Sequence, residues 1–247
     1  MKAEVQYNLA IAQYHQYHTG NVDRAIELFG EVIGAENATP SLRLLSTAAR
    51  AQAYAMCMIP WRPDEPNCAR IEELFTRVAD EKRQALRQLK KIDDKSISAE
   101  VRWMIHNATG MSLMYHSDYF GGSEEKIHVL TTALEQLNAA DHDSPLNWAN
   151  YCDLGSAHMR LGYWRNGDGA ELENALTYLR TVVDEFRPNY GFALYEIGRA
   201  YRINKQFDAA QDWFAKSLAI PGDRRDVEDQ RVKIEVDRAE RSDSTYP

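Results

Sequence analysis

Apolar residues recur every three or four positions along most of this chain, a spacing typical of amphipathic helices. The clearest instance is residues 190–221, where two apolar stripes are separated by the short turn Asn204-Lys205-Gln206. Gly198 and Ala210 stand where the two helices are expected to cross, and close crossings need small side chains. This segment therefore predicts an antiparallel helix pair. The stripes are formed by Leu194, Ile197, Ala200 and Tyr201 and by Ala209, Ala210, Trp213, Phe214, Ser217 and Leu218.

The same periodicity predicts helices along the rest of the chain. Thr39-Pro40 indicates a helix start, because threonine caps helices and proline suits their first turn. We expect further starts at Ser98, Ser123 and Ser144-Pro145. Three prolines between Ile59 and Pro66 predict a loop. The expected helices are 3–18, 22–33, 40–58, 67–92, 98–119, 123–137 and 146–161, a partner helix that ends before Pro188, and 222–241.

Residues 190–221 resemble the tetratricopeptide repeat, a helix-turn-helix unit of about 34 residues. Ile197-Gly198, Tyr201, Ala210, Phe214 and Pro221 stand at the motif positions.

Two other segments share parts of this spacing. Leu154-Gly155 precedes Ala175 and Leu179, and near the start of the chain Ala25 precedes Phe29.

The resemblance implies an all-α fold, a solenoid of about five antiparallel helix pairs, because one pair alone cannot bury its apolar stripe. We expect a single superhelical domain spanning 1–247, closed by a C-terminal capping helix. The expected repeats are about 3–35, 39–92, 97–139, 145–187 and 189–221, with the capping helix at 222–241.

Composition narrows the functional classes. The formal net charge of −8 disfavours nucleic-acid binding, which needs a clustered basic surface. No apolar run approaches the length of a membrane span. The N-terminus lacks the pattern of a signal peptide, and three scattered cysteines favour a reducing compartment. We therefore expect a cytoplasmic protein that binds neither nucleic acid nor membranes.

The sequence offers no constellation for catalysis, a cofactor or a metal. His15 and His18 have a spacing that two metal ligands can have, but nothing nearby completes a site. Gly167-Asp168-Gly169 lacks the lysine and the preceding strand of a phosphate loop. We therefore expect a protein that is not an enzyme and that holds no cofactor.

The resemblance implies that the first helix of each pair lines a concave surface and binds a partner segment. Aromatic residues and arginines are common interface anchors, but the same positions are also compatible with ordinary exposed helix residues. Carried over by position, this surface holds Asn107, Met111, Tyr115, Asp153, Ser156, Arg160, Tyr195, Glu196, Arg199 and Arg202.

The function implied is that of a protein-protein interaction scaffold, an adaptor or a regulatory subunit of a multi-protein assembly. The alternative is a regulatory protein whose groove senses a peptide or small ligand, and a helical enzyme is less favoured. As a helix, 222–241 places apolar residues on two sides, which suggests contact with a partner or a second copy. Alternation of Val232, Ile234 and Val236 with charges leaves a strand as the competing interpretation.

Overall fold

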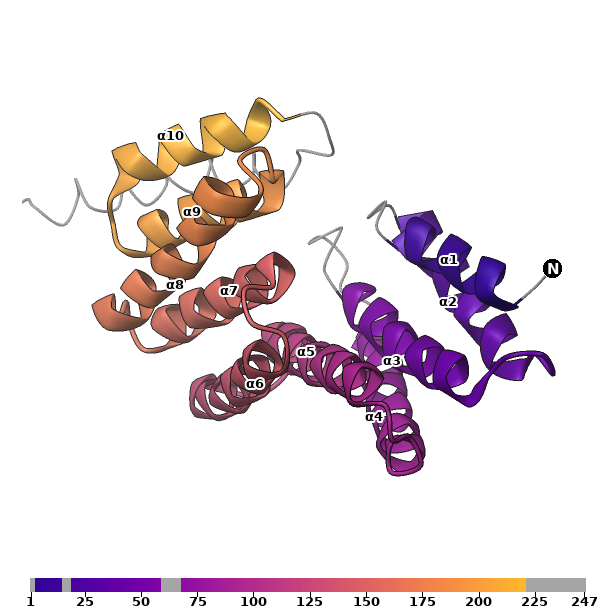
Figure 1. Ribbon diagram of the computed structural model, residues 1–247. Coiled ribbons are helices and arrows are strands. Elements are labelled where there is room, and N and C mark those ends of the chain that lie inside the picture. The colour runs from indigo at the N-terminus through magenta and orange to yellow at the C-terminus, as the bar shows by residue number, and fades with distance from the viewer. Residues whose placement is uncertain (1–2, 15–18, 59–67, 221–247) are drawn as a thin grey trace, which may run out of the picture. The chain divides into compact units, whose positions relative to one another are not determined.

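A computed structural model describes residues 3–14, 19–58 and 68–220 (Figure 1). Within these residues every regular element is a helix and there is no strand, which confirms the predicted all-α class. The predicted capping helix 222–241 and the proline-rich loop lie outside the described residues. The helices are α1 Ala3–Tyr14, α2 Thr19–Gly34, α3 Pro40–Met56, α4 Cys68–Leu89, α5 Lys95–Tyr119, α6 Ser123–Asp143, α7 Trp148–Trp164, α8 Gly169–Thr181, the π-helical turn η1 Val182–Phe186, α9 Gly191–Ile203 and α10 Phe207–Leu218.

The chain divides into two compact units. Unit 1 comprises Met1–Leu146 and contains α1 to α6, and unit 2 comprises Asn147–Pro247 and contains α7 to α10. The boundary falls at the start of the fourth predicted repeat, 145–187. The single superhelix expected from the sequence stays a prediction.

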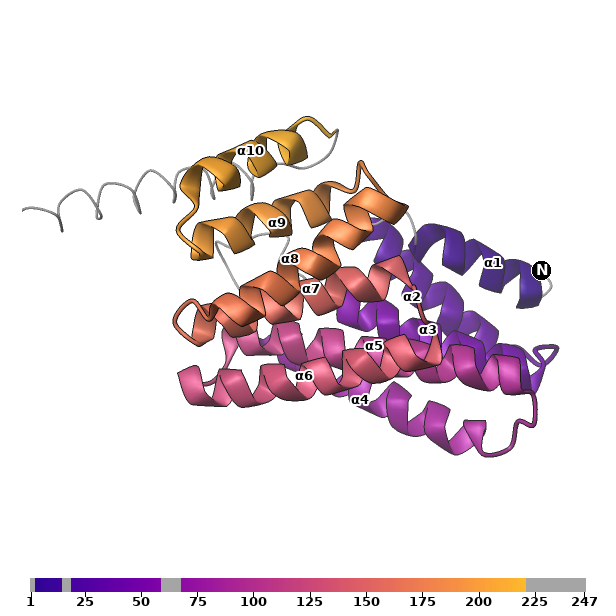
Figure 2. The ribbon, with the colours of Figure 1, turned by 60° about the vertical axis from the view of Figure 1, so that its left-hand side comes forward.

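Within each unit, helices that follow one another in the chain pack side by side. Figures 1 and 2 show α5 beside α6 in unit 1, and α9 beside α10 in unit 2. First helices of successive pairs also meet, α3 with α5 and α7 with α9. This arrangement buries the apolar stripes of the inner helices against more than one neighbour, whereas α6 packs on α5 and α10 on α9.

Three glycines allow three helix pairs to cross closely. A Cβ on Gly198 would lie 2.4 Å from ring atoms of Phe214. A Cβ on Gly155 would lie 2.5 Å from Cγ of Leu179 and 3.1 Å from the carbonyl oxygen of Ala175. These two crossings follow the spacing that the sequence indicated.

The third crossing, in unit 1, was missed in the sequence. A Cβ on Gly110 would lie 2.6 Å from Cγ of Leu137 and 3.1 Å from the carbonyl oxygen of Ala133. In all three pairs the first helix contributes a glycine, and the second contributes a large apolar residue four positions after an alanine. The long α5 and α6 place this glycine 23 positions before its alanine, so the short spacing of the last pair does not reveal it.

One of the four predicted helix starts is confirmed. Thr39 caps α3, and its Oγ1 accepts a hydrogen bond from the Leu42 N–H at 3.2 Å. Ser98 does not cap α5, because the carboxylate of Asp94 accepts the N–H groups of Ser96 and Ile97 and starts the helix earlier.

The other two predicted starts are also wrong. Ser123 lies inside the first turn of α6, whose N-cap is Gly122. Ser144-Pro145 is followed by Leu146 with a φ of 61°, outside the helical region, and α7 starts only after Asn147. The Asn147 side chain accepts the N–H of Ala149 at 3.1 Å and so caps that helix.

The interior of unit 1 contains polar pairs between its helices. Gln52 Nε2 on α3 donates to Asn107 Oδ1 on α5 at 3.0 Å, and both side chains are buried. Arg50 on α3 lies 2.6 Å from the Glu81 carboxylate on α4. Burial raises the pKa of the Glu81 carboxyl, and the nearby Arg50 guanidinium only partly opposes this effect.

None of the helices in the described ranges combines the length and apolar character that crossing a bilayer requires.

Candidate functional site

The ten residues expected on the partner-binding surface are mostly buried. Seven are buried, and three, all on α9, are partly exposed. In unit 1, Asn107, Met111 and Tyr115 lie in the interior, where Asn107 bonds Gln52. A partner could reach these three side chains only after the surrounding side chains move, so their role in binding stays a prediction. The partly exposed residues are Tyr195, Arg199 and Arg202.

In unit 2 the structure brings three of the expected residues together as an ion trio. Arg199 Nη1 donates to Glu196 Oε1 at 2.8 Å, and Arg160 Nη1 on α7 lies 3.7 Å from Glu196 Oε2. The side chain of Glu196 is 1% exposed, that of Arg160 6% and that of Arg199 25%. The carboxylate is therefore held inside between two guanidinium groups, one of which reaches the surface.

Asp153 and Ser156 lie on α7 near this trio and are also buried. Arg160 Nη1 donates to the Ser156 carbonyl oxygen at 3.3 Å. Burial raises the pKa of the neighbouring Cys152 thiol well above its usual range, and the carboxylates of Asp153 and Glu196 raise it further. A thiol that stays protonated at neutral pH is not an activated nucleophile.

Four aromatic side chains of unit 2 contact one another in succession beside the ion trio, and we name them the aromatic row. Trp148 meets Tyr190 edge-on with ring centroids 5.2 Å apart, and the Tyr190 and Phe192 centroids are 6.2 Å apart. Phe192 and Tyr195 follow at 6.4 Å. All four rings are partly exposed. Tyr195 also packs against the buried Phe214 at 6.0 Å, which fixes this end of the row in the core.

Arginines cover two of these rings. The Arg187 guanidinium carbon lies 4.3 Å above the Trp148 ring centroid, and that of Arg199 lies 5.7 Å above the Tyr195 centroid. Both distances are within the range of cation–π attraction. The row therefore presents aromatic faces with positive charge at two places.

Local structure explains how the row forms. Trp148 is the first residue of α7, and Tyr190 is the N-cap of α9. Phe192, Tyr195 and Arg199 are spaced by three and four residues on α9 and so share one side of it. The row is therefore built at the start of two first helices that pack against each other.

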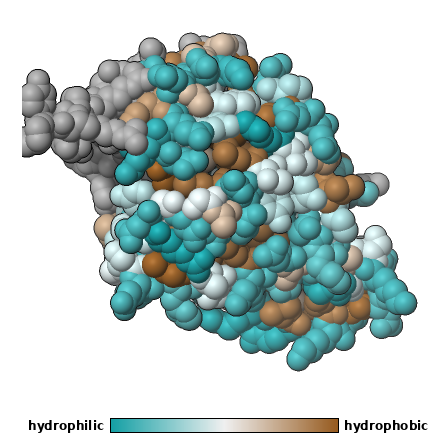
Figure 3. All heavy atoms as spheres, turned by 90° about the vertical axis from the view of Figure 1, so that its left-hand side faces the viewer, coloured by the Kyte–Doolittle hydropathy of each residue, from teal (hydrophilic) through white to brown (hydrophobic). Residues whose placement is uncertain are grey.

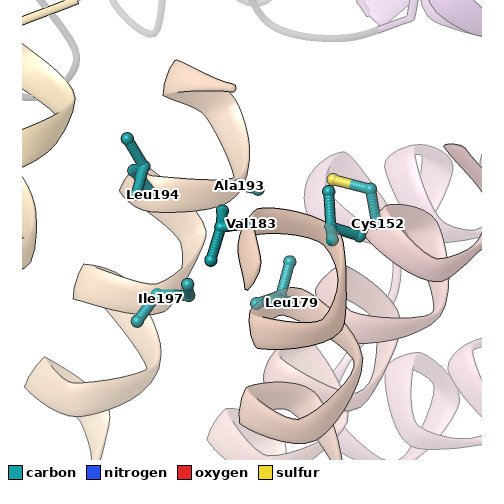
Figure 4. Packing of buried hydrophobic residues seen from close by; sticks show 7 residues of the cluster. Cys152, Leu179, Val183, Ala193, Leu194 and Ile197 are labelled. Carbon is teal, nitrogen blue, oxygen red and sulfur yellow. The ribbon is translucent and has the colours of Figure 1, made fainter. Parts of the chain in front are cut away.

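The π-helical turn η1 positions Arg187. Val182 and Val183 of this turn are buried, and the Arg187 N–H bonds the Val182 carbonyl oxygen at 2.7 Å. Figure 4 shows Val183 and Leu179 packed between Cys152 of α7 and Ile197 of α9. Because this apolar cluster anchors η1, it also fixes the residue that follows it above Trp148. Single π-helical turns are often found at functional sites.

The side chains of this arrangement have the chemistry of a binding surface. Aromatic rings accept apolar groups, and guanidinium groups accept carboxylates or phosphates. Across the described ranges, no three His, Cys, Asp or Glu side chains gather as metal ligands would. His15 and His18 lie outside those ranges.

Tyr195 and Arg199 are among the residues expected from the sequence, whereas Trp148, Tyr190, Phe192 and Arg187 are not. A signal was present, because Asn147-Trp148 and Asn189-Tyr190 place the same asparagine-aromatic step at the start of two successive first helices. No sequence pattern indicated the π-helical turn that positions Arg187.

On the side of the molecule drawn in Figure 3, apolar residues reach the surface in separate patches bounded by polar ones. The search for related proteins gave no further indication of function. No protein family model matches this chain, and no curated protein matches it.

Proposed function

We propose that this protein is an interaction scaffold, an adaptor or regulatory subunit whose helix pairs hold a protein partner. The first helices of unit 2, α7 and α9, supply the contact surface. The proposal retains the resemblance to tetratricopeptide repeats as its framework, and the shared glycine crossings of three pairs support that framework.

The aromatic row is the observation that carries this proposal. Tryptophan, tyrosine and arginine are the residues that most often dominate interface energies. Here four aromatic rings stay partly exposed, although the core of unit 2 lies directly behind them. Two arginines extend over the rings, which adds an electrostatic component to an otherwise apolar contact.

Capture of partners from the native host tests the proposal. The wild-type chain and an Arg187→Glu, Arg202→Glu variant are compared, and captured proteins are identified by mass spectrometry and retested in purified form. We expect the variant to lose the principal partner by more than about tenfold, because reversed charges repel an anionic partner group.

The control is Lys205→Glu with Lys216→Glu, which makes the same charge change at exposed positions that have no contact with a ring of the row in the described residues. It should capture the partner as the wild type does, and both variants should melt like the wild type. Retention of the partner by both folded variants would place the interface elsewhere, and the proposal would fail.

Arg199 is left unchanged in this test. It bonds the Oε1 atom of the buried Glu196, so Arg199→Glu would place two carboxylates together and unfold the helix pair. Arg202 lies one turn further along α9 on the same side and is partly exposed.

Ligand sensing is the second candidate, and one observation favours it. Ser156 Oγ and Glu196 Oε2 are buried, and neither atom has a hydrogen bond to protein within the described residues. A small polar molecule that donates a hydrogen bond to Glu196 Oε2 would satisfy that atom. Such a ligand would raise the melting temperature in a concentration-dependent way, because it binds only the folded state.

A further inference from the structure

We propose that residues 222–241 dock on the aromatic row of the same chain and so compete with the partner for it. This segment lies outside the described residues. The proposal is argued from the surface it would cover, from the point where the described chain ends, and from the pattern of its own sequence.

The described chain ends beside the aromatic row. Ser217 Oγ near the end of α10 donates to the Gly191 carbonyl oxygen at 2.9 Å. A Cβ on Gly191 would lie 3.7 Å from Cβ of Ile220, the last described residue. Because Gly191 stands between Tyr190 and Phe192, the described chain ends next to the middle of the row. A tether this short gives the segment a high effective concentration at that surface.

The segment has an apolar side bordered by acidic residues. With 3.6 residues per turn, Val232, Val236 and Ala239 fall on one side of a helix. Three acidic residues lie within about 60° of Val232 on this projection, and one basic residue, Arg225, lies among them at about 20°. Arg224 lies at about 80°, and the other four basic residues lie about 100° or more from Val232, so this side keeps a net negative charge. The acidic residues are Glu228, Asp229 and Glu235, and the four distant basic ones are Arg231, Lys233, Arg238 and Arg241.

This side complements the aromatic row in both apolar character and charge. Arg187 and Arg199 lie over rings of the row, and Arg202 lies one turn further along α9, so the acidic residues of the segment would face cations there. The outward side of α10 is the alternative surface, and it carries the exposed acids Asp208 and Asp212 together with the exposed Lys216. The net charge of these three residues is negative, which disfavours an acidic segment, so the charges favour the row.

The length of the segment also fits. As a helix, residues 223–241 would extend ~28 Å, whereas α9 with its 13 residues extends ~20 Å. The segment can therefore run along the whole of α9 and cover the row from Tyr190 to Tyr195. Docking does not depend on what the protein binds, but competition with a partner rests on the proposed function.

The test measures amide hydrogen exchange in the full-length protein. The variant Glu228→Lys, Glu235→Lys reverses two charges on the side that would face the row. Its matched control, Asp226→Lys with Asp237→Lys, reverses two charges on the opposite side. We expect the first variant to lose about tenfold of the protection in 222–241, equivalent to ~1.4 kcal/mol, and the control to keep it. Equal protection in both variants would overturn the proposal.

A charge swap identifies the surface on which the segment docks. Arg187→Glu with Arg202→Glu should reduce the protection of 222–241 to the same extent. When these arginine substitutions are combined with Glu228→Lys and Glu235→Lys, most of the lost protection of 222–241 should return. The charges of the row and of the segment are then opposite again. A segment that instead packs on α10 would not respond to the arginine substitutions, and this outcome would refute docking on the row.

Two further readouts separate the remaining alternatives. Protection that rises over a tenfold increase in protein concentration would show a second copy as the occupant and overturn docking within one chain. Partner capture should increase in the Glu228→Lys, Glu235→Lys variant. If protection responds as expected but capture responds to neither set of substitutions, docking stands and the proposed partner surface fails.

Discussion

The two units join their first helices with different chemistry. In unit 1 a neutral amide pair, Gln52 and Asn107, connects α3 to α5. In unit 2 a buried carboxylate, Glu196, connects α9 to Arg160 of α7 and also holds Arg199. The neutral pair is wholly interior, whereas the charged trio reaches the surface beside the aromatic row.

This difference shows which contact is suited to binding. Burying charged groups is costly, and a hydrophobic contact of similar volume is often as stable or more stable. The charged trio is therefore a poor choice for stability alone, and its placement beside partly exposed aromatic rings favours a role in binding. The amide pair of unit 1 needs no such explanation.

Removing the carboxylate of unit 2 should have the largest effect. We expect Glu196→Ala to lower the free energy of unfolding by about 3–5 kcal/mol, because it leaves the buried Arg160 without the carboxylate that offsets its charge. Urea denaturation followed by labelling of Cys152 measures this effect in unit 2, since that thiol is buried. Glu196→Gln should lower the free energy of unfolding by less, because its amide oxygen still accepts a hydrogen bond from Arg199. If Glu196→Ala lowers the free energy of unfolding no more than Asn107→Ala does in unit 1, the contrast between the units disappears.

Overpacking a glycine crossing should affect both units alike. Gly110→Leu and Gly198→Leu should each cost about 3 kcal/mol, the upper end for overpacking, because even a Cβ meets the facing side chain closer than 3 Å. Cys57 reports unfolding of unit 1 and Cys152 that of unit 2. Gly34→Leu is the control, since a Cβ there meets nothing within 4 Å. A melting temperature within about a degree of wild type for either crossing variant would contradict the shared geometry.

Breaking the amide pair of unit 1 should cost less. Asn107→Ala leaves the buried Gln52 amide without its acceptor, and we expect a loss of about 1–2 kcal/mol. Replacing both residues with leucine should restore most of this loss, because no polar group is then left inside. A loss for Asn107→Ala as large as that for Glu196→Ala would contradict the contrast between a neutral and a charged contact.

The smallest effect concerns pH and belongs to unit 1. The Glu81 carboxyl has a pKa above its ordinary 4.5 in the folded protein, so the folded state binds more protons between the two values. The free energy of unfolding should therefore fall as pH rises through that range and stay lower above it. Urea titrations between about pH 4 and 7 should show a flatter profile for Glu81→Gln.

An exposed carboxylate of the same unit is the control. Arg77 and Arg70 lower the pKa of Glu73 through their hydrogen bonds, so its contribution is present above the ordinary value and is lost as pH falls. Glu73→Gln should consequently change the slope of unfolding free energy against pH only weakly, and in the direction opposite to Glu81→Gln. A steeper profile in Glu81→Gln would show that its ion pair with Arg50 outweighs burial.

The fold class and most helices could be predicted because periodicity and turns are local signals. Thr39-Pro40 predicted a cap correctly, as both residues act within one turn. The helix starts predicted at Ser98 and Ser144-Pro145 were wrong, because the side chains of Asp94 and Asn147, a few residues away, cap these helices instead. The crossing at Gly110 was not predicted, because Leu137 lies 27 positions later in the sequence and only the packing of α5 on α6 brings the two together.

The candidate site was only partly predictable for the same reason. Tyr195 and Arg199 follow from the repeat register, which is a sequence property. The burial of Asn107 and Glu196 depends on how first helices pack against one another, which spacing within one helix does not specify. Arg187 owes its place above Trp148 to a π-helical turn, and no residue type marks such a turn in advance.

The glycine crossings also bear on how such a chain changes in length over evolutionary time. Gly110 and Gly155 are 45 positions apart, and Gly155 and Gly198 are 43 apart. A deletion from one glycine to the next would join the first half of one helix to the second half of another and keep a glycine at the junction. The fused helix would meet a second helix that already carries the matching alanine and large apolar residue. Descendants could therefore lose or duplicate whole helix pairs in a single genetic event and still fold.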